Sequence, residues 1–311
     1  MSRSEGPSAE PPQAGPRPLG GSADVPIGRG ADKYAVIGNP IGHSKSPLIH
    51  GSFAAATGQH IEYTAIEGPL EPEGGFGDAV RAFIRAGGLG MNVTAPFKLK
   101  AYALATERSE DAQRAGAANA LKFEGDRILA QNFDGVGLVN DIQRNLACPM
   151  RGKRVLVLGA GGAVRGALRP FLAQRPAQLV VANRTLSKAV GLVAGLDGAA
   201  AGVISACDYA DLATMARQER FDLVVNATSA SLKGELPPVP ATVFGADALA
   251  YELVYGKGLT PFLRLAQHAG VNRLADGVGM LAEQAAEAFE WWRGVRPDTR
   301  AVIDRLTIPL A

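Results

Sequence analysis

The fold-deciding stretch is Arg154-Val-Leu-Val-Leu-Gly159-Ala-Gly161-Gly162-Ala-Val-Arg-Gly166, which is followed by Val180-Val-Ala-Asn183-Arg184-Thr185. Its first part, Val155 to Leu158, is a continuous apolar run, typical of a parallel strand that is buried on both faces. Glycines at 159 and 161 allow a sharp turn into a helix, and without a Cβ they let a pyrophosphate approach the helix N–H groups. The stretch predicts a Rossmann-type dinucleotide-binding domain.

The second strand of this unit ends in a basic sequence, Asn183-Arg184-Thr185. About 20 residues after the glycine loop, such sites usually carry an Asp or Glu that bonds the ribose 2′-hydroxyl. A guanidinium pairs instead with a 2′-phosphate, so Arg184 favours NADP over NAD. The glycine motif is imperfect, because a strict G-x-G-x-x-G would have glycine at Val164. The loop alone is therefore equally compatible with a turn that binds no ligand.

Composition excludes several classes of protein. With 311 residues, 47% hydrophobic and 20% charged, the chain is long enough for about two globular domains. A net charge of +2 and the absence of a basic cluster indicate no nucleic-acid surface. The apolar runs are shorter than the roughly 20 residues of a membrane helix, which predicts a cytoplasmic protein without a membrane partner. Neither the two cysteines nor the four histidines have metal-ligand spacing, so no metal is expected.

Residues 1–30 are rich in proline and glycine and predict a disordered tail. Order is expected from the strand Tyr34 to Ile37. Ser46 is a good N-cap for the following helix, with Pro47 in its first turn and Gly58 at its end. The remaining elements expected in this first part are strands at 61–66 and 90–93, a helix at 77–86, and a hairpin from 119–123 and 127–130.

A linking helix with apolar residues Val136, Leu138, Val139 and Ile142 then leads into the Rossmann strand. Further strands are predicted near 178–182, 202–204, 222–226 and 248–253. Pro170 is expected to kink or break the phosphate-binding helix early. A C-terminal helix over 279–292 has apolar residues at helical spacing and should pack back on the first domain. The expected domains are 31–134, completed by 278–311, for the substrate and 135–277 for the cofactor, with a cleft between them.

Polar side chains follow several of the predicted strands, and ligands of open α/β sheets bind at the carboxyl ends of strands. Two hydroxyls, Ser44 and Ser46, can hold a carboxylate at a helix N-terminus. Ring hydroxyls can be bound by other polar residues: Asn92, Thr94, Asn119 and Gln284. Several of these residues also have an explanation without a ligand. The Ser46 hydroxyl can cap its own helix, the asparagines can be turn residues, and Gln284 can be a surface residue.

Hydride transfer between an alcohol and NADP also needs a proton carrier for the hydroxyl oxygen. Lys98 and Asp134 are the best pair in the chain for this role. A lysine ammonium can protonate the forming alkoxide while a carboxylate orients it. Lys98 taken alone would more commonly be a solvated surface lysine.

Several collinear motifs resemble the shikimate dehydrogenase family from about residue 33 to 310. Among them are Gly38-Asn-Pro-Ile-Gly-His-Ser-Lys-Ser-Pro47, Asn92-Val-Thr-Ala-Pro-Phe-Lys98, Asn226-Ala-Thr-Ser229 and Asp276-Gly-Val-Gly-Met-Leu-Ala-Glu-Gln284. The resemblance implies a two-domain α/β enzyme, NADPH-dependent reduction of 3-dehydroshikimate to shikimate, and a place in aromatic amino acid biosynthesis. It does not imply whether the enzyme is a monomer or a homodimer.

The resemblance also implies roles for individual residues. Lys98 would be the acid/base and Asp134 its partner, while Tyr255 would join Ser44, Ser46 and the four ring-binding residues in the substrate shell. The implied cofactor contacts are Glu110, Gly159, Ala160, Gly161, Gly162, Ala163, Asn183, Arg184, Thr185, Lys188, Leu253 and Gly277.

One departure concerns the pocket edge, because the family usually has Asn-Thr-Asp where this chain has Asn132-Phe133-Asp134. Two alternatives to a shikimate dehydrogenase remain. A quinate or aminoshikimate dehydrogenase would use the same frame for a differently substituted ring. A catalytically silent NADP-binding sensor would need no Lys98 and Asp134 pair.

Overall fold

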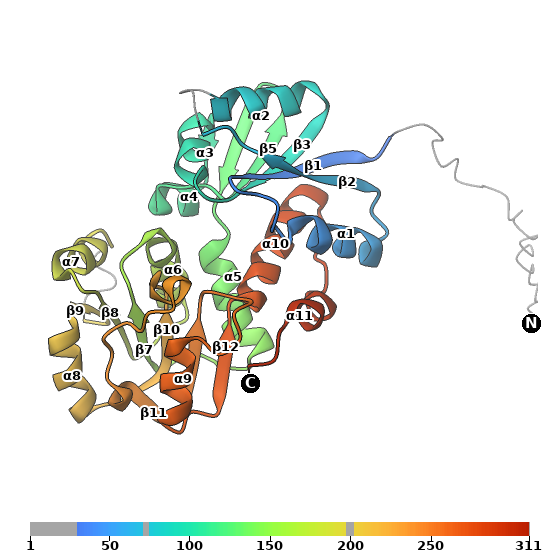
Figure 1. The fold of residues 1–311 in the computed structure, drawn as a ribbon. Coiled ribbons are helices and arrows are strands. Elements are labelled where there is room, and N and C mark those ends of the chain that lie inside the picture. The colour runs from blue at the N-terminus through green and yellow to red at the C-terminus, as the bar shows by residue number, and fades with distance from the viewer. Residues whose placement is uncertain (1–29, 71–74, 197–201, 311) are drawn as a thin grey trace, which may run out of the picture. The chain divides into compact units, whose positions relative to one another are not determined.

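Two mixed or parallel β-sheets organise the described residues of the computed structural model, which are 30–70, 75–196 and 202–310. The predicted tail therefore lies, apart from Gly30, outside the described residues. Within the described chain the first sheet has the order β2-β1-β3-β5-β6-β4; its strands β1, β2, β3 and β5 are labelled in Figure 1. Its strands are β1 (Asp32–Gly38), β2 (Ile61–Glu67), β3 (Gly88–Val93), β4 (Glu107–Arg108), β5 (Ala120–Glu124) and β6 (Arg127–Gln131).

Parallel pairing in this sheet is confined to part of it. β1 pairs in parallel with β2 and β3, whereas β5 is antiparallel to both β3 and β6. The predicted hairpin is confirmed, and Gly125 supplies the positive φ of 60° at its turn. The helices along this part are α1 (Ser46–Thr57), α2 (Gly75–Arg85), α3 (Lys98–Leu104), α4 (Glu110–Ala115), α5 (Asp134–Asn140) and the π-helical η1 (Asp141–Asn145).

The second sheet is parallel throughout the described chain, in the order β12-β11-β10-β7-β8-β9. This order is that of a doubly wound dinucleotide-binding sheet, whose direction of winding changes between β7 and β10. The strands are β7 (Arg154–Leu158), β8 (Gln178–Ala182), β9 (Ile204–Cys207), β10 (Phe221–Asn226), β11 (Phe244–Glu252) and β12 (Arg273–Asp276). All four further strands expected in this half are confirmed, with shifted ends for β9 and β11.

Helices cover both faces of the second sheet, which explains the continuous apolar runs of its strands. They are α6 (Gly162–Ala173), α7 (Leu186–Ala194), α8 (Tyr209–Gln218) and α9 (Pro261–His268), with the short 3₁₀ turns η3 (Ala230–Lys233) and η4 (Ala241–Val243). Val155 and Val157 face one core, and Leu156 and Leu158 face the other. Alternate side chains of this buried strand thus point to opposite faces of the sheet, and each face has its own hydrophobic core.

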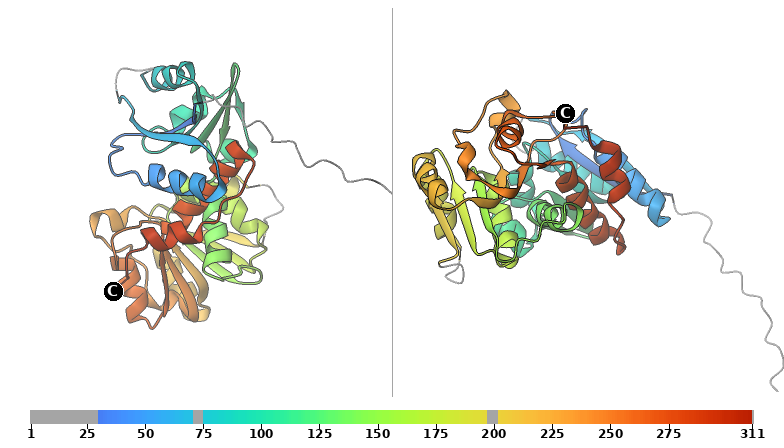
Figure 2. Two further views of the ribbon diagram at one scale, coloured as in Figure 1. Left: turned by 90° about the vertical axis from the view of Figure 1, so that its right-hand side faces the viewer. Right: turned by 90° about the horizontal axis from the view of Figure 1, so that it is seen from below.

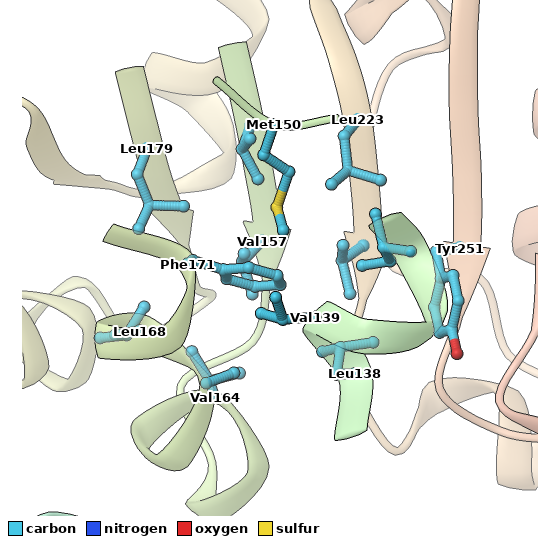
Figure 3. Packing of buried hydrophobic residues seen from close by; sticks show 14 of the residues in the cluster. Leu138, Val139, Met150, Val157, Val164, Leu168, Phe171, Leu179, Leu223 and Tyr251 are labelled. Carbon is cyan, nitrogen blue, oxygen red and sulfur yellow. The ribbon is translucent and has the colours of Figure 1, made fainter. Parts of the chain in front are cut away.

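The first of these cores also holds the C-terminal part of the linking helix α5. Leu138 and Val139 of α5 pack with Val157, Phe171 and Tyr251 (Figure 3). The predicted apolar face of this helix is therefore confirmed. Since Asp134 is the first residue of α5, this packing fixes the helix from which its carboxylate projects.

The C-terminal helices are α10 (Val278–Arg293) and α11 (Arg300–Leu306). α10 lies next to α1 and α5 (Figures 1 and 2), as the buried contacts of Phe289 with Ile49 and Phe53 also indicate. Its Trp292 donates an indole N–H to the Leu121 carbonyl oxygen, 3.0 Å away. The prediction that this helix packs on the first part of the chain is confirmed.

Pro170 does not break α6, because the helix continues through it to Ala173; the predicted alternative, a kink, stays a prediction. Proline cannot donate to the carbonyl four residues earlier, which belongs to Gly166. Gly135 of α5 packs against that carbonyl so closely that an added Cβ would lie 2.2 Å from its oxygen. The Gly166 carbonyl that Pro170 leaves without a partner thus faces the neighbouring helix α5. After Pro170, α6 continues for about one turn.

The chain from Ala31 onward forms one compact unit. The two sheets have separate cores, but the predicted domain boundaries at 134/135 and 277/278 stay a prediction. No helix among the described residues is both long and apolar enough to cross a bilayer.

The contact between α5 and α10 allows a test of this packing. At Gly137 an added Cβ would lie 2.7 Å from the backbone nitrogen of Gln284. We expect Gly137→Ala to lower the free energy of unfolding by about 1–3 kcal/mol, since the two backbones must separate. Gly51→Ala in α1, where nothing lies within 4 Å, is the control and should be neutral or slightly stabilising. Denaturant unfolding measures both, and equal midpoints for Gly137→Ala and the wild type would contradict the packing.

Candidate active site

Polar side chains from both halves of the chain line one pocket of about 370 Å³. It lies beyond the carboxyl ends of β1 and β3, against the start of α10. Every residue predicted to bind substrate or catalyse is among its lining: Ser44, Ser46, Asn92, Thr94, Lys98, Asn119, Asp134, Tyr255 and Gln284. The structure therefore brings together residues that the sequence places on separate elements.

Lys98 and Asp134 form an ion pair in this pocket. The Lys98 Nζ lies 2.6 Å from Asp134 Oδ2, and each residue is the first of its helix, α3 or α5. The Asp134 side chain is only 15% exposed, whereas that of Lys98 is 35% exposed. The carboxylate is thus largely shielded from water, while the ammonium remains accessible from the pocket. Such a pair can hold a proton donor in a fixed position.

Asn119 connects this pair to α10. Its Nδ2 donates to Asp134 Oδ1 at 2.8 Å and to Gln284 Oε1 at 3.2 Å. Its Oδ1 accepts the backbone N–H of Phe133 at 2.9 Å, which fixes the orientation of the amide. Neither Asn119 nor Gln284 is merely a turn or surface residue, because both belong to one hydrogen-bonded network around the carboxylate.

The turn before α1 differs from the prediction. Ser46 is the first residue of the helix and Lys45 is its N-cap, without a side-chain hydrogen bond, so the prediction of Ser46 as N-cap is wrong. The Ser44 hydroxyl instead accepts the N–H of Ser46, at 3.3 Å. A hydroxyl two residues earlier takes over part of the capping role, which leaves the Ser46 hydroxyl at the pocket. The predicted Gly58 at the helix end is confirmed, with φ of 65°.

Phe133 does not line the pocket. Its ring packs edge-on against Trp291, 5.8 Å between centroids, and the residue is 7% exposed. The phenylalanine that replaces the usual family residue at this position therefore affects the hydrophobic contact with α10 and not the lining of the pocket. The part of Phe133 that serves the site is its backbone N–H.

A second pocket, of about 480 Å³, follows β7 and β8. The predicted cofactor residues in its lining are Gly159, Ala160, Gly161, Asn183, Arg184, Thr185 and Lys188. Gly162 and Ala163 begin α6 beside it, and Leu253 and Gly277 line the first pocket instead. Glu110 lines neither of these pockets; it starts α4 and pairs with Arg114 at 2.6 Å.

The residues of the second pocket fit a phosphorylated dinucleotide. Gly159 has a φ of 110°, and an added Cβ would lie 3.1 Å from the Ala227 carbonyl oxygen. Gly161, in contrast, has no atom near its missing Cβ, which leaves room for a ligand at the start of α6. The first N–H groups of a helix have no partner within the helix and suit a pyrophosphate. Arg184 and Lys188 add two exposed cations to the same pocket.

Sequence reasoning assigned no role to the loop after β10, although residues 227–230 line the second pocket. Asn226 shapes this loop, because its Oδ1 accepts both the N–H and the hydroxyl of Thr228. Its Nδ2 donates to Glu252, 2.9 Å away, which also accepts the hydroxyl of Ser231. Burial raises the pKa of the Glu252 carboxyl. The Asn226-Ala-Thr-Ser229 motif was the feature of the sequence that could have pointed to this loop. Its residues have no spacing that is typical of a binding site.

Within residues 30–70, 75–196 and 202–310 no group of three or more His, Cys, Asp or Glu side chains could hold a metal ion. The two cysteines, Cys148 and Cys207, are buried and free.

Three family models match separate parts of the chain. A shikimate dehydrogenase substrate binding domain matches residues 36–121, and a shikimate/quinate 5-dehydrogenase model matches 141–233. A shikimate 5'-dehydrogenase C-terminal domain matches 277–307. The matched ranges include most residues that line the two pockets, whereas Asp134, Leu253 and Tyr255 lie between them.

Similar proteins extend over nearly the whole chain. The NADP(+) shikimate dehydrogenase of Nitrosospira multiformis is 54% identical over 89% of this chain and 97% of its own. The crystal structure of an Ael1 enzyme from Pseudomonas putida is 62% identical, with a TM-score of 0.85 over 90% of this chain and all of that one. A shikimate 5-dehydrogenase from Thermus thermophilus, solved in complex with NADP(H) and shikimate, is 30% identical, with a TM-score of 0.75 over 88% and 97%.

Proposed function

The chain belongs to the shikimate dehydrogenase family, and from this premise we infer that it is an NADP-dependent oxidoreductase that interconverts 3-dehydroshikimate and shikimate. The observation that carries this inference is the Lys98–Asp134 ion pair inside a pocket lined with hydroxyl and amide groups. An acid/base pair has no use in a protein that only binds a dinucleotide. The pocket therefore favours an enzyme over a silent NADP-binding sensor.

The polar lining suggests one orientation for the substrate acid. Ser44 and Ser46 stand where α1 begins, and their two hydroxyls, at the positive end of the helix, suit a carboxylate. At the other side of the pocket Lys98 and Asp134 would reach the ring oxygen that reacts. The ring hydroxyls would be bound by Asn92, Thr94, Asn119, Tyr255 and Gln284.

The residues of the chain supply the proton of the reaction. In the direction of reduction, the carbonyl oxygen at ring position C3 gains negative charge, and the Lys98 ammonium donates a proton to it. Asp134 keeps the ammonium in place at 2.6 Å, and Asn119 holds the second carboxylate oxygen. In the direction of oxidation, Lys98 takes the proton back from the hydroxyl.

NADP, when bound, supplies or accepts the hydride. The glycine loop and the start of α6 would hold its pyrophosphate, and Arg184 with Lys188 would pair with the 2′-phosphate. Leu253 and Gly277 line the substrate pocket, and we assign them to the nicotinamide end. Glu110, which is in neither pocket lining, remains an unsupported cofactor contact.

Crossed kinetics test this function. Shikimate and quinate are each offered with NADP and with NAD, and cofactor reduction is followed by absorbance. We expect the highest kcat/KM for shikimate with NADP. Quinate turnover equal to or above that of shikimate would instead assign the pocket to a quinate dehydrogenase, and no turnover with any pair would favour the sensor.

A further inference from the structure

A tyrosine behind the substrate pocket bonds to one of the residues that line it. Tyr63, on β2, donates its hydroxyl to Asn92 Oδ1 at 2.6 Å. Asn92 lies at the end of β3, is 5% exposed and lines the pocket, whereas Tyr63 does not. β1 separates the two strands, so the tyrosine side chain reaches across one strand to the amide.

The ring of Tyr63 is held by a buried histidine. His50 of α1 stacks on it with centroids 4.3 Å apart and planes 6° apart. Burial lowers the pKa of His50 to about 3, so the imidazole is neutral at physiological pH. Neither of its ring nitrogens has a hydrogen-bond partner within the described chain. His50 thus acts as a flat neutral surface for the tyrosine.

The hydroxyl of Tyr63 decides which end of the Asn92 amide faces a ligand. Because Oδ1 accepts the tyrosine proton, the amide nitrogen must take the other position. Its Nδ2 donates one hydrogen to the Asn119 carbonyl oxygen at 3.4 Å. Within the described residues this leaves the second N–H for a ligand in the pocket. An amide without the tyrosine hydroxyl would be free to turn and present its oxygen instead.

We propose that Tyr63 is a positioning residue of the substrate pocket, which sets Asn92 as a hydrogen-bond donor to an oxygen of the ring acid. The inference rests on the proposed function, because it names the substrate group that Asn92 meets. Tyr63 itself touches no reacting atom; its hydroxyl acts through Asn92 and also bonds the side chain of Ser46. Its loss should therefore weaken substrate binding and leave the chemical step nearly intact.

Tyr63→Phe removes only the hydroxyl and keeps the ring on His50. The KM for shikimate should rise about 5- to 10-fold, as expected for one lost hydrogen bond, with kcat and the KM for NADP within about twofold of the wild type. Tyr34→Phe is the matched control. Tyr34 pairs with Tyr63 across β1 and β2, and its hydroxyl accepts from Arg293 instead of a pocket residue. This variant should keep the wild-type KM.

A second comparison separates positioning from general packing. In an Asn92→Ala background, Tyr63→Phe should raise the KM for shikimate by clearly less than it does in the wild type, because Asn92 is absent and only the contact with Ser46 remains. An unchanged KM in Tyr63→Phe alone, or an undiminished effect in the Asn92→Ala background, would overturn the proposal. The wild type and Tyr34→Phe report on the proposed function separately, since absence of shikimate turnover in both would refute that function and this inference with it.

Discussion

Lys98→Ala is expected to lower kcat for shikimate oxidation by about 10²- to 10⁴-fold, the usual contribution of a positioned acid/base group. The ammonium lies 2.6 Å from Asp134 and faces the pocket, so its removal leaves the hydroxyl oxygen without a proton carrier. The dissociation constant of shikimate should change only modestly, because the serine and amide contacts remain. Stopped-flow turnover and equilibrium binding measure the two quantities separately.

The matched control for this variant is Lys100→Ala, on the same helix α3. Lys100 lies near the face of Phe97, 5.8 Å from its ring centroid, and is not in the pocket lining. It should keep wild-type turnover and binding. A Lys98→Ala enzyme with near-normal kcat would remove Lys98 from the mechanism.

Arg184→Ala is expected to weaken NADP much more than NAD. The guanidinium is exposed in the second pocket with Lys188, where a 2′-phosphate would find two cations. Loss of a charge-assisted hydrogen bond should raise the KM for NADP about 10- to 100-fold. The KM for NAD, which has no 2′-phosphate, should change by less than about threefold.

Arg217→Ala is the control for the change in charge. Arg217 is exposed near the end of α8, a helix that packs on the second sheet, and it does not line the second pocket. Its removal should leave both cofactors unaffected. Equal losses of NADP and NAD in Arg184→Ala would show that the arginine supports the pocket without selecting the phosphate.

The second sheet was predictable because its strands carry their burial in the sequence. Strands such as Val155 to Leu158 are apolar at every position, which requires cover on both faces, and the glycines after them mark the turn into α6. Most strands of the first sheet were predicted, but its two-residue β4 and the β12 of the second sheet were not, because neither is a continuous apolar run. The order in which β5 and β6 extend the first sheet depends on pairing between distant segments, which local patterns do not encode.

The site was predictable as a set of residue types, and less so in its orientations. Ser46 was misassigned as an N-cap because a nearby hydroxyl, that of Ser44, meets its N–H instead. The role of Phe133 at the pocket edge was open from the sequence, and the structure packs its ring against Trp291 of α10. Tyr63 carried no signal at all, since an aromatic residue in a strand is ordinary until its partner across β1 is known.

Combined variants of Lys98 and Asp134 test most directly whether the two residues act as one unit. kcat for shikimate with NADP is measured for Lys98→Ala, Asp134→Asn and the double variant. If Asp134 works by holding the ammonium, the double variant should lie within about threefold of Lys98→Ala alone. Losses that multiply to the product of the two single variants would show that the residues act independently, which would contradict an acid/base pair.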